Sequence, residues 1–136
     1  MGANRTRVLF FAEAVTLAHV ARPLCLARAL DPDRFEVHLA SSDSYASLVN
    51  DTPFARHTLR SIPPQQFMDA LANGSPVYSA DTLAGYVEED QRLMAAVRPD
   101  VVVGDFRISL GVSAELSGIP YVTVTNAYWS PYAEPR

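Results

Sequence analysis

A histidine and an aspartate that lie far apart in the sequence could together carry acid–base chemistry. His19 follows the apolar run 8–12 after a loop of several residues, and Asp105 comes just after the apolar run 101–103. A carboxylate that accepts a hydrogen bond from one imidazole nitrogen fixes the tautomer, and the other nitrogen can then take a proton from a hydroxyl group. A helix amino terminus beside the ring would lower its pKa, whereas the carboxylate would raise it. The simpler alternative is that His19 and Asp105 each cap a helix.

A second group of side chains is large and apolar and could line a pocket for a flat, lipophilic ligand. Its members are Phe67, Met68, Tyr78, Phe106, Tyr128 and Trp129. Each of these side chains could instead belong to the hydrophobic core. Glu13 could add a second carboxylate and Arg107 could hold a phosphate, but an exposed or capping glutamate and a solvated arginine are the more usual cases. His38 and His57 fall in or beside predicted strands and are expected to be structural.

Short apolar runs alternate with segments of helical period, a pattern typical of a parallel sheet covered by helices on both faces. The predicted strands are residues 8–12, 35–40, 55–59, 101–103 and 121–124, of which 55–59 is the weakest. The predicted helices are residues 18–30, 43–49, 79–97 and 108–116. Residues 61–76 are rich in Pro, Gln and Gly, which indicates a long, partly helical loop. The fold class is therefore α/β.

Right-handed crossovers between these strands give the spatial order 3-2-1-4-5, a Rossmann-like, doubly wound sheet in a single domain. Ligands bind such sheets at the carboxyl ends of the strands, near the point where the strand order reverses. Here that point lies between the first and fourth strands. His19 and Asp105 leave adjacent strands at this rim, so we expect them to meet. No Gly-x-Gly-x-x-Gly follows the first strand, which excludes a dinucleotide-binding turn.

The composition excludes several classes of function. With 136 residues and 49% hydrophobic content, the chain can form the core of one domain. A net charge of -4 without a basic stripe argues against nucleic acid as a partner. All eleven basic residues are arginine, which excludes a lysine nucleophile, a pyridoxal Schiff base and a Walker-type phosphate loop. The single cysteine and the three scattered histidines lack the spacing of metal ligands. A single cysteine cannot form an internal disulfide, which fits a reducing cytoplasm. No apolar stretch is long enough to span a membrane.

Two segments that flank the predicted rim carry recognisable motifs. The first runs from Arg7 to Pro23 (RVLFFAEAVTLAHVARP) and continues through LARALDP and FEVHLA. The second begins at Pro99 (PDVVVGDF) and continues through GIPYVTVTN. Together they resemble the amino-terminal acceptor domain of the GT-B nucleotide-sugar glycosyltransferases, of the inverting kind that modifies natural products such as macrolides and flavonoids. The resemblance covers nearly the whole chain except residues 51–80, and Ala18 stands where many members have glycine.

The resemblance implies a role for each candidate residue. His19 matches the family's His-x-x-x-Pro motif, which implies that it is the catalytic base, and Asp105 matches the fourth-strand aspartate that orients the base. The implied function is transfer of a hexose from a nucleotide sugar to a hydroxyl group of a lipophilic small molecule, without a metal or a bound cofactor. Residues 1–136 would then be the acceptor-binding domain of a truncated or half protein. A carboxyl-terminal domain or a partner chain would bind most of the nucleotide sugar.

Other functions stay open on the sequence alone. The chain could be a non-catalytic module that binds a small molecule, or a subunit that needs a partner chain. A flavodoxin-like regulatory domain has less support, because the acidic cluster and the lysine of receiver domains are missing.

Overall fold

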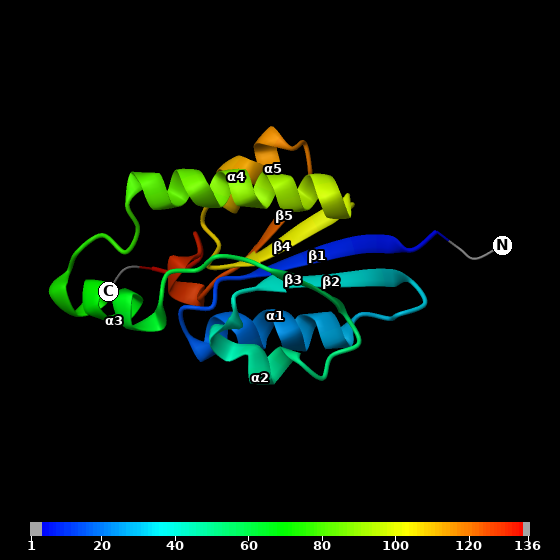
Figure 1. Cartoon of the computed structure of the whole chain (residues 1–136), viewed down its shortest axis with the longest axis horizontal. Coiled ribbons are helices and arrows are strands. Elements are labelled where there is room, and N and C mark those ends of the chain that lie inside the picture. The colour runs from blue at the N-terminus through cyan, green and yellow to red at the C-terminus, as the bar shows by residue number, and fades with distance from the viewer. Residues whose placement is uncertain (1–3, 135–136) are drawn as a thin grey trace.

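A five-stranded parallel sheet forms the centre of the computed structural model, which describes residues 4–134 apart from the side chain of Tyr128 (Figure 1). The strands are β1 (Thr6–Ala12), β2 (Phe35–Ser41), β3 (Ala55–Thr58), β4 (Val101–Asp105) and β5 (Tyr121–Val124). Their spatial order is β3-β2-β1-β4-β5, which confirms the order predicted from the sequence. β1 and β4 are direct neighbours, and Ala12 lies opposite Asp105 at the carboxyl end of the pair.

Helices cover both faces of the sheet (Figure 1). The helices α1 (Leu17–Ala29) and α2 (Ala46–Val49) lie on one face, and α4 (Ala80–Val97) and α5 (Leu110–Leu116) lie on the other. The helix α3 (Pro64–Asn73) lies beyond the carboxyl ends of the strands, and short 3-10 turns are formed by Asp43–Tyr45 and Ala127–Trp129. The α/β class is therefore confirmed.

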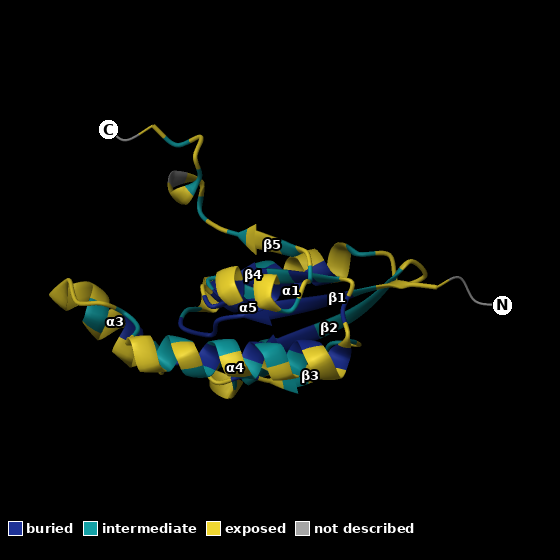
Figure 2. Ribbon diagram, turned by 90° about the horizontal axis from the view of Figure 1, so that it is seen from above, coloured by how far each residue is buried: buried dark blue, intermediate teal, exposed yellow. Residues whose placement is uncertain are grey.

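The side chains of β1 alternate between two halves of the apolar core. Val8, Phe10 and Ala12 pack on the side of α1, whereas Leu9 and Phe11 pack on the side of α4 and α5. All five are buried, as expected for a central strand that is covered on both faces (Figure 2). This packing holds the carboxyl end of β1 firmly in place beside β4.

The helix α3 lies within residues 61–76, which were predicted as a long, partly helical loop; the helical part is confirmed and takes up most of this segment. Pro64 lies in the first turn, where its fixed φ and missing N–H are tolerated. Gly74 ends the helix in the left-handed conformation with a φ of 62°. Both end signals are present in the sequence, and Phe67 is the one residue of the helix that is buried.

The strand β5 forms one edge of the sheet, and the chain after it extends away from the sheet (Figure 2). Within residues 4–134, none of the helices combines the length and the apolar character that a membrane crossing requires.

Candidate functional site

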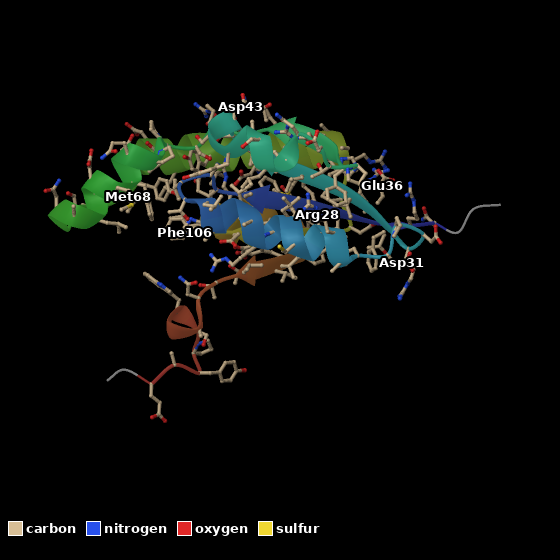
Figure 3. The ribbon with its side chains drawn as sticks, turned by 90° about the horizontal axis from the view of Figure 1, so that it is seen from below. Arg28, Asp31, Glu36, Asp43, Met68 and Phe106 are labelled. Carbon is tan, nitrogen blue, oxygen red and sulfur yellow. The ribbon has the colours of Figure 1, made fainter. Side chains whose placement is uncertain are left out.

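The candidate site lies where β1 and β4 end. The ladder between them continues one residue past β1, because the backbone N–H of Glu13 donates to the carbonyl oxygen of Asp105 at 3.2 Å. The chain then enters α1 at Leu17, and after β4 it turns through Phe106 towards α5. Figure 3 shows Phe106 at the end of the molecule where α3 and its residue Met68 also lie.

His19 lies in the first turn of α1 and is almost completely buried, with 8% of its surface exposed. Its Nδ1 atom shares a hydrogen bond of 3.0 Å with the hydroxyl oxygen of Thr16. The ring of Phe106 stacks on the imidazole at a centroid distance of 4.7 Å, and the ring of Phe67 packs edge-on at 6.1 Å. Residues from α1, α3 and the turn after β4 therefore hold the imidazole.

Asp105 is also buried, with 1% of its surface exposed, but its hydrogen-bond partner is Arg22. The Nε and Nη2 atoms of Arg22 donate to the two carboxylate oxygens, each at 2.8 Å. The Nη1 atom donates to the side-chain oxygen of Asn126 at 2.6 Å. Over the described part of the chain, no hydrogen bond joins His19 to Asp105. The two residues lie at the same rim, as expected, but the direct pair expected from the sequence is not formed.

The surroundings keep His19 neutral at pH 7. Burial, and secondarily the positive charge of Arg22, lower the pKa of the imidazole to about 4. Burial raises the pKa of Asp105, while the hydrogen bonds and the charge of Arg22 oppose that rise. The expected upward effect of a carboxylate on the imidazole pKa is missing because Arg22 balances the charge of Asp105. His19 therefore has a lone pair available at neutral pH but holds a proton weakly.

Phe106 reaches the imidazole through an unusual backbone conformation. Its φ is 58°, in the left-handed region that costs a residue with a side chain about 1 kcal/mol or more. This turn comes directly after Asp105 and brings the aromatic ring against His19. No glycine or asparagine stands at this position, so the sequence gives no signal for the turn.

Three of the six predicted pocket residues come together. Phe67, Tyr78 and Phe106 pack around Val15 and Ile62, and we call these five residues the aromatic cluster. Phe67 meets Phe106 edge-on at a centroid distance of 5.5 Å. Since Phe67 and Phe106 also contact His19, the cluster packs directly against the imidazole.

The other three predicted pocket residues do not join the aromatic cluster. Met68 and Trp129 have 53% and 72% of their surfaces exposed, and their role in acceptor binding stays a prediction. The side chain of Tyr128 lies outside the described residues.

Arg107 is completely buried, contrary to the solvated arginine considered from the sequence. Its Nε atom donates to Asp90 at 3.0 Å, and its Nη2 atom donates to Glu89 at 3.1 Å. Its Nη1 atom donates to the backbone carbonyl of Arg60 at 2.6 Å, and the guanidinium lies 3.8 Å from the centre of the Tyr86 ring. These contacts join α4 to the loops that precede α3 and follow β4.

Glu13 is buried too, with 1% of its surface exposed, so it is neither an exposed residue nor a helix cap. The hydroxyl group of Tyr78 donates to Oε2 of Glu13 at 3.0 Å, and a nitrogen of Arg107 lies 3.7 Å from the same oxygen. Burial raises the pKa of Glu13, and the charge of Arg107 opposes this effect. Glu13 therefore anchors the aromatic cluster through Tyr78.

Across residues 4–134, no three side chains of His, Cys, Asp or Glu gather in a way that could hold a metal ion. The chemistry that the described arrangement offers is proton transfer at His19.

Comparison with curated proteins links the chain to mycobacterial glycosyltransferases. It is 52% identical over all 136 residues to the PGL/p-HBAD biosynthesis rhamnosyltransferase of Mycobacterium bovis. It is 47% identical over 134 residues to a PGL/p-HBAD biosynthesis glycosyltransferase of Mycobacterium tuberculosis, and equally so to an inactive PGL/p-HBAD biosynthesis glycosyltransferase of Mycobacterium bovis. The chain spans 30%, 31% and 37% of the lengths of these three proteins. No family model matches the chain.

Comparison with solved structures places the same fold in larger glycosyltransferases. The glycotransferase of kitacinnamycin superposes with a TM-score of 0.69 at 21% identity, over 89% of this chain and 30% of that chain. Phytolacca americana UGT2, solved with UDP-2-fluoro-glucose and pterostilbene, superposes with a TM-score of 0.64 at 18% identity, over 90% of this chain and 31% of that chain. At these identities the likeness establishes the fold alone.

Proposed function

We propose that this chain, an amino-terminal portion of a GT-B glycosyltransferase, binds the acceptor in a sugar-transfer reaction. The portion is related to the mycobacterial PGL/p-HBAD glycosyltransferases. In this proposal, residues 1–136 form the acceptor-binding domain and receive a hydroxyl group of a lipophilic small molecule. A nucleotide sugar is held mainly by protein outside this chain, either a carboxyl-terminal domain or a partner chain.

The observation that carries the proposal is the position of His19. A neutral imidazole lies at the rim where β1 and β4 end, and it is stacked on Phe106 of the aromatic cluster. Aromatic walls suit a lipophilic acceptor, and a neutral imidazole suits removal of a proton from a hydroxyl group. Both requirements of the acceptor side therefore meet at one place.

The proposed transfer exchanges one bond for another at the anomeric carbon of the sugar. His19 takes the proton of the acceptor hydroxyl, and an electron pair of that oxygen forms the new bond to the anomeric carbon. The bond from this carbon to the phosphate oxygen breaks, and the nucleoside diphosphate leaves with that electron pair. Attack opposite the leaving group inverts the configuration. Asp105 supports the base indirectly, because its negative charge balances that of Arg22, which would otherwise disfavour the protonated imidazole more strongly.

The relatives suggest the class of sugar and of acceptor. Because the relative at 52% identity is a rhamnosyltransferase, we propose a deoxyhexose as the transferred sugar, which is narrower than the hexose expected from the sequence. The proposed acceptor is a hydroxyl group of the phenolic-glycolipid type. A nucleotide-sugar cosubstrate and a single unpaired cysteine fit the cytoplasm, which we propose as the location.

The proposal can be tested in a chimera in which residues 1–136 replace the matching segment of the Mycobacterium bovis rhamnosyltransferase. We expect this chimera to transfer its sugar, and we expect His19→Ala to lower kcat by about 10²- to 10⁴-fold, the usual contribution of a general base. His57→Ala changes a histidine of β3 outside the site and is the matched control. A His19→Ala chimera with the kcat of the parent would refute the assigned base.

One observation favours a second candidate function. A relative at 47% identity is named inactive, so a chain of this kind can persist without transfer activity. In that case the chain binds the acceptor but the chimera transfers nothing. Calorimetry with the acceptor, run beside the transfer assay, separates the two functions, because binding without transfer is the result expected of a binding module.

A further inference from the structure

Thr16 is the residue that bonds to the imidazole of His19. It precedes α1 in the extended conformation of an N-cap residue, yet its side chain makes no capping bond to the helix backbone. Threonine at this position ordinarily accepts a hydrogen bond from an N–H group of the first turn. Here its hydroxyl oxygen lies 3.0 Å from Nδ1 of the imidazole instead. The hydroxyl group of Thr16 is thus hydrogen-bonded to the imidazole ring and not to the backbone at the start of α1.

Both carboxylate oxygens of Asp105 are bonded to another side chain. Its two oxygens accept parallel bonds from Arg22, which is the strongest geometry between these two side chains. Arg22 also donates to Asn126, so its guanidinium joins α1, β4 and the segment after β5. If Asp105 left this pair to reach His19, it would leave the guanidinium without its counter-charge.

Aromatic packing fixes the plane of the imidazole but not its orientation within that plane. The ring of Phe106 is within 14° of parallel to it, and the ring of Phe67 is at 88° to it. A half-turn about the Cβ–Cγ bond of His19 keeps both contacts while it exchanges ring nitrogen and ring carbon positions. The contacts with the two phenylalanine rings are nearly the same in both orientations. A hydroxyl group, in contrast, hydrogen-bonds to a ring nitrogen and not to a ring carbon.

We propose that Thr16 is the positioning residue of His19, and that Asp105 positions Arg22. The hydroxyl oxygen of Thr16 accepts the hydrogen bond from Nδ1–H, so that Nε2 carries the lone pair that takes the proton of the acceptor. This inference rests on the proposed role of His19 as the base. It assigns the orienting role to a neutral side chain at the N-cap of α1, in place of the carboxylate at the end of β4.

The nitrogen chemical shifts of His19 in the isotopically labelled chain at pH 7 report the tautomer directly. We expect the proton on Nδ1 in the parent chain, in Thr16→Ser and in Asp105→Asn. Thr16→Val keeps the shape of the side chain but removes the hydroxyl group. It should shift the ratio of tautomers towards Nε2–H by at least about threefold, the effect of losing one ordinary hydrogen bond.

Several outcomes would overturn the assignment. A proton on Nε2 in the parent chain does so without any variant, and therefore decides the matter even if Thr16→Val fails to fold. The assignment also fails if Thr16→Val has the same tautomer ratio as the parent chain. It fails as well if Asp105→Asn changes the tautomer ratio as much as Thr16→Val does.

Kinetics in the chimera add a second readout. Thr16→Val should lower kcat about tenfold or more with little change in the KM of the acceptor, because a turned ring no longer presents its lone pair. Thr16→Ser should restore kcat. The two proposals fail separately: full activity of His19→Ala would refute the base, whereas the nitrogen spectrum alone decides whether Thr16 sets the tautomer.

Discussion

At the residue scale, the environment of His19 favours a particular kind of acceptor. An imidazole with a pKa of about 4 takes a proton most readily from a group that is itself acidic. A phenol, with a pKa of about 10, meets this requirement far better than an aliphatic alcohol. Thr16 fixes the ring without adding a negative charge, and the positive charge of Arg22 disfavours the protonated ring. Neither neighbour therefore raises the basicity of the imidazole, which an acceptor hydroxyl of high pKa would require.

The first prediction concerns the acceptor dependence of the loss at His19. In the chimera, His19→Ala should reduce kcat/KM more for alcohol acceptors than for phenols, because a phenol ionises without much help. The measurement compares kcat/KM for a matched phenol and benzyl alcohol in the parent and in the variant. Equal and small losses for both acceptors would mean that His19 is a packing residue and that the base lies elsewhere.

The second prediction concerns stability against pH. The pKa of His19 is about 4 in the folded chain and near 6.5 in the unfolded chain, so between these values the unfolded chain binds more protons. The free energy of unfolding contributed by His19 should therefore fall as the pH is lowered from about 6.5 to about 4, by at most about 3 kcal/mol.

Urea denaturation of the parent chain and of His19→Gln at a series of pH values isolates this contribution. Glu13, Asp90 and Asp105 have raised pKa values and act in the opposite direction, but they are present in both proteins and cancel in the difference. A difference between the two proteins that does not change from pH 7 to pH 4 would contradict the prediction.

At the scale of elements, the turn after β4 places Phe106 on the imidazole and so contributes to the burial that lowers the pKa of His19. Phe106→Ala removes the stacked ring and opens the imidazole to water, so the pKa of His19 should rise from about 4 towards 6.5. The loss of a half-buried ring should also cost about 1–3 kcal/mol of stability. Phe54→Ala removes another half-buried ring, packed against the α1 side of the core, and is the matched control.

An NMR titration of His19 checks both variants. The control should lose stability without moving the His19 pKa. If Phe106→Ala leaves this pKa near 4, the stacked ring does not cause the shift.

The elements differ in how far the sequence could predict them. The strands and the long helices follow from apolar runs and helical periodicity, and the order 3-2-1-4-5 follows from right-handed crossovers. The helix α3 was predicted only as the helical part of a loop, because the Pro, Gln and Gly residues of this segment are typical of loops. Its proline start and glycine end were the available signals.

The candidate site was predictable in location but not in its contacts. Adjacent strands brought His19 and Asp105 to one rim, as the topology required. The partner of Asp105 is Arg22, because a guanidinium can bond to both carboxylate oxygens at once and a neutral imidazole cannot. Arg22 lies one helical turn after His19 on the same side of α1, and this spacing was the signal available in the sequence.

At the scale of the whole molecule, Arg107 joins the helix layer of α4 to the rim. It is buried among Asp90, Glu89 and Glu13, so removal of its charge leaves buried carboxylates without their counter-charge. Arg107→Met should therefore lower the free energy of unfolding by about 3–5 kcal/mol. Arg28→Met changes an exposed arginine of α1 and should alter stability by less than about 0.5 kcal/mol (Figure 3).

Urea denaturation at pH 7 measures both changes. A cost below about 1 kcal/mol for Arg107→Met would show that the buried carboxylates do not depend on this guanidinium, since the loss of one partner from a buried pair ordinarily costs several times more.

The last prediction concerns the division of substrate binding between this chain and the rest of a complete enzyme. A diphosphate needs uncompensated positive charge or a glycine-rich run of backbone N–H groups. The sequence has no lysine, and no Gly-x-Gly-x-x-Gly follows β1. The two arginines that flank the rim are already paired, Arg22 with Asp105 and Arg107 with Asp90, so neither offers a net charge to a phosphate.

Calorimetry of the chain alone should therefore detect no binding of a nucleotide sugar, whereas the chimera, which contains the remaining part of the rhamnosyltransferase, should bind it. Arg22→Gln in the chimera should leave this affinity within about twofold, because an arginine already paired with a carboxylate gains little from a second anion. Micromolar binding of a nucleotide sugar to the isolated chain at a one-to-one ratio would place the donor site on this rim. In that case Arg22 would have to exchange Asp105 for the diphosphate, and the acceptor would need another wall.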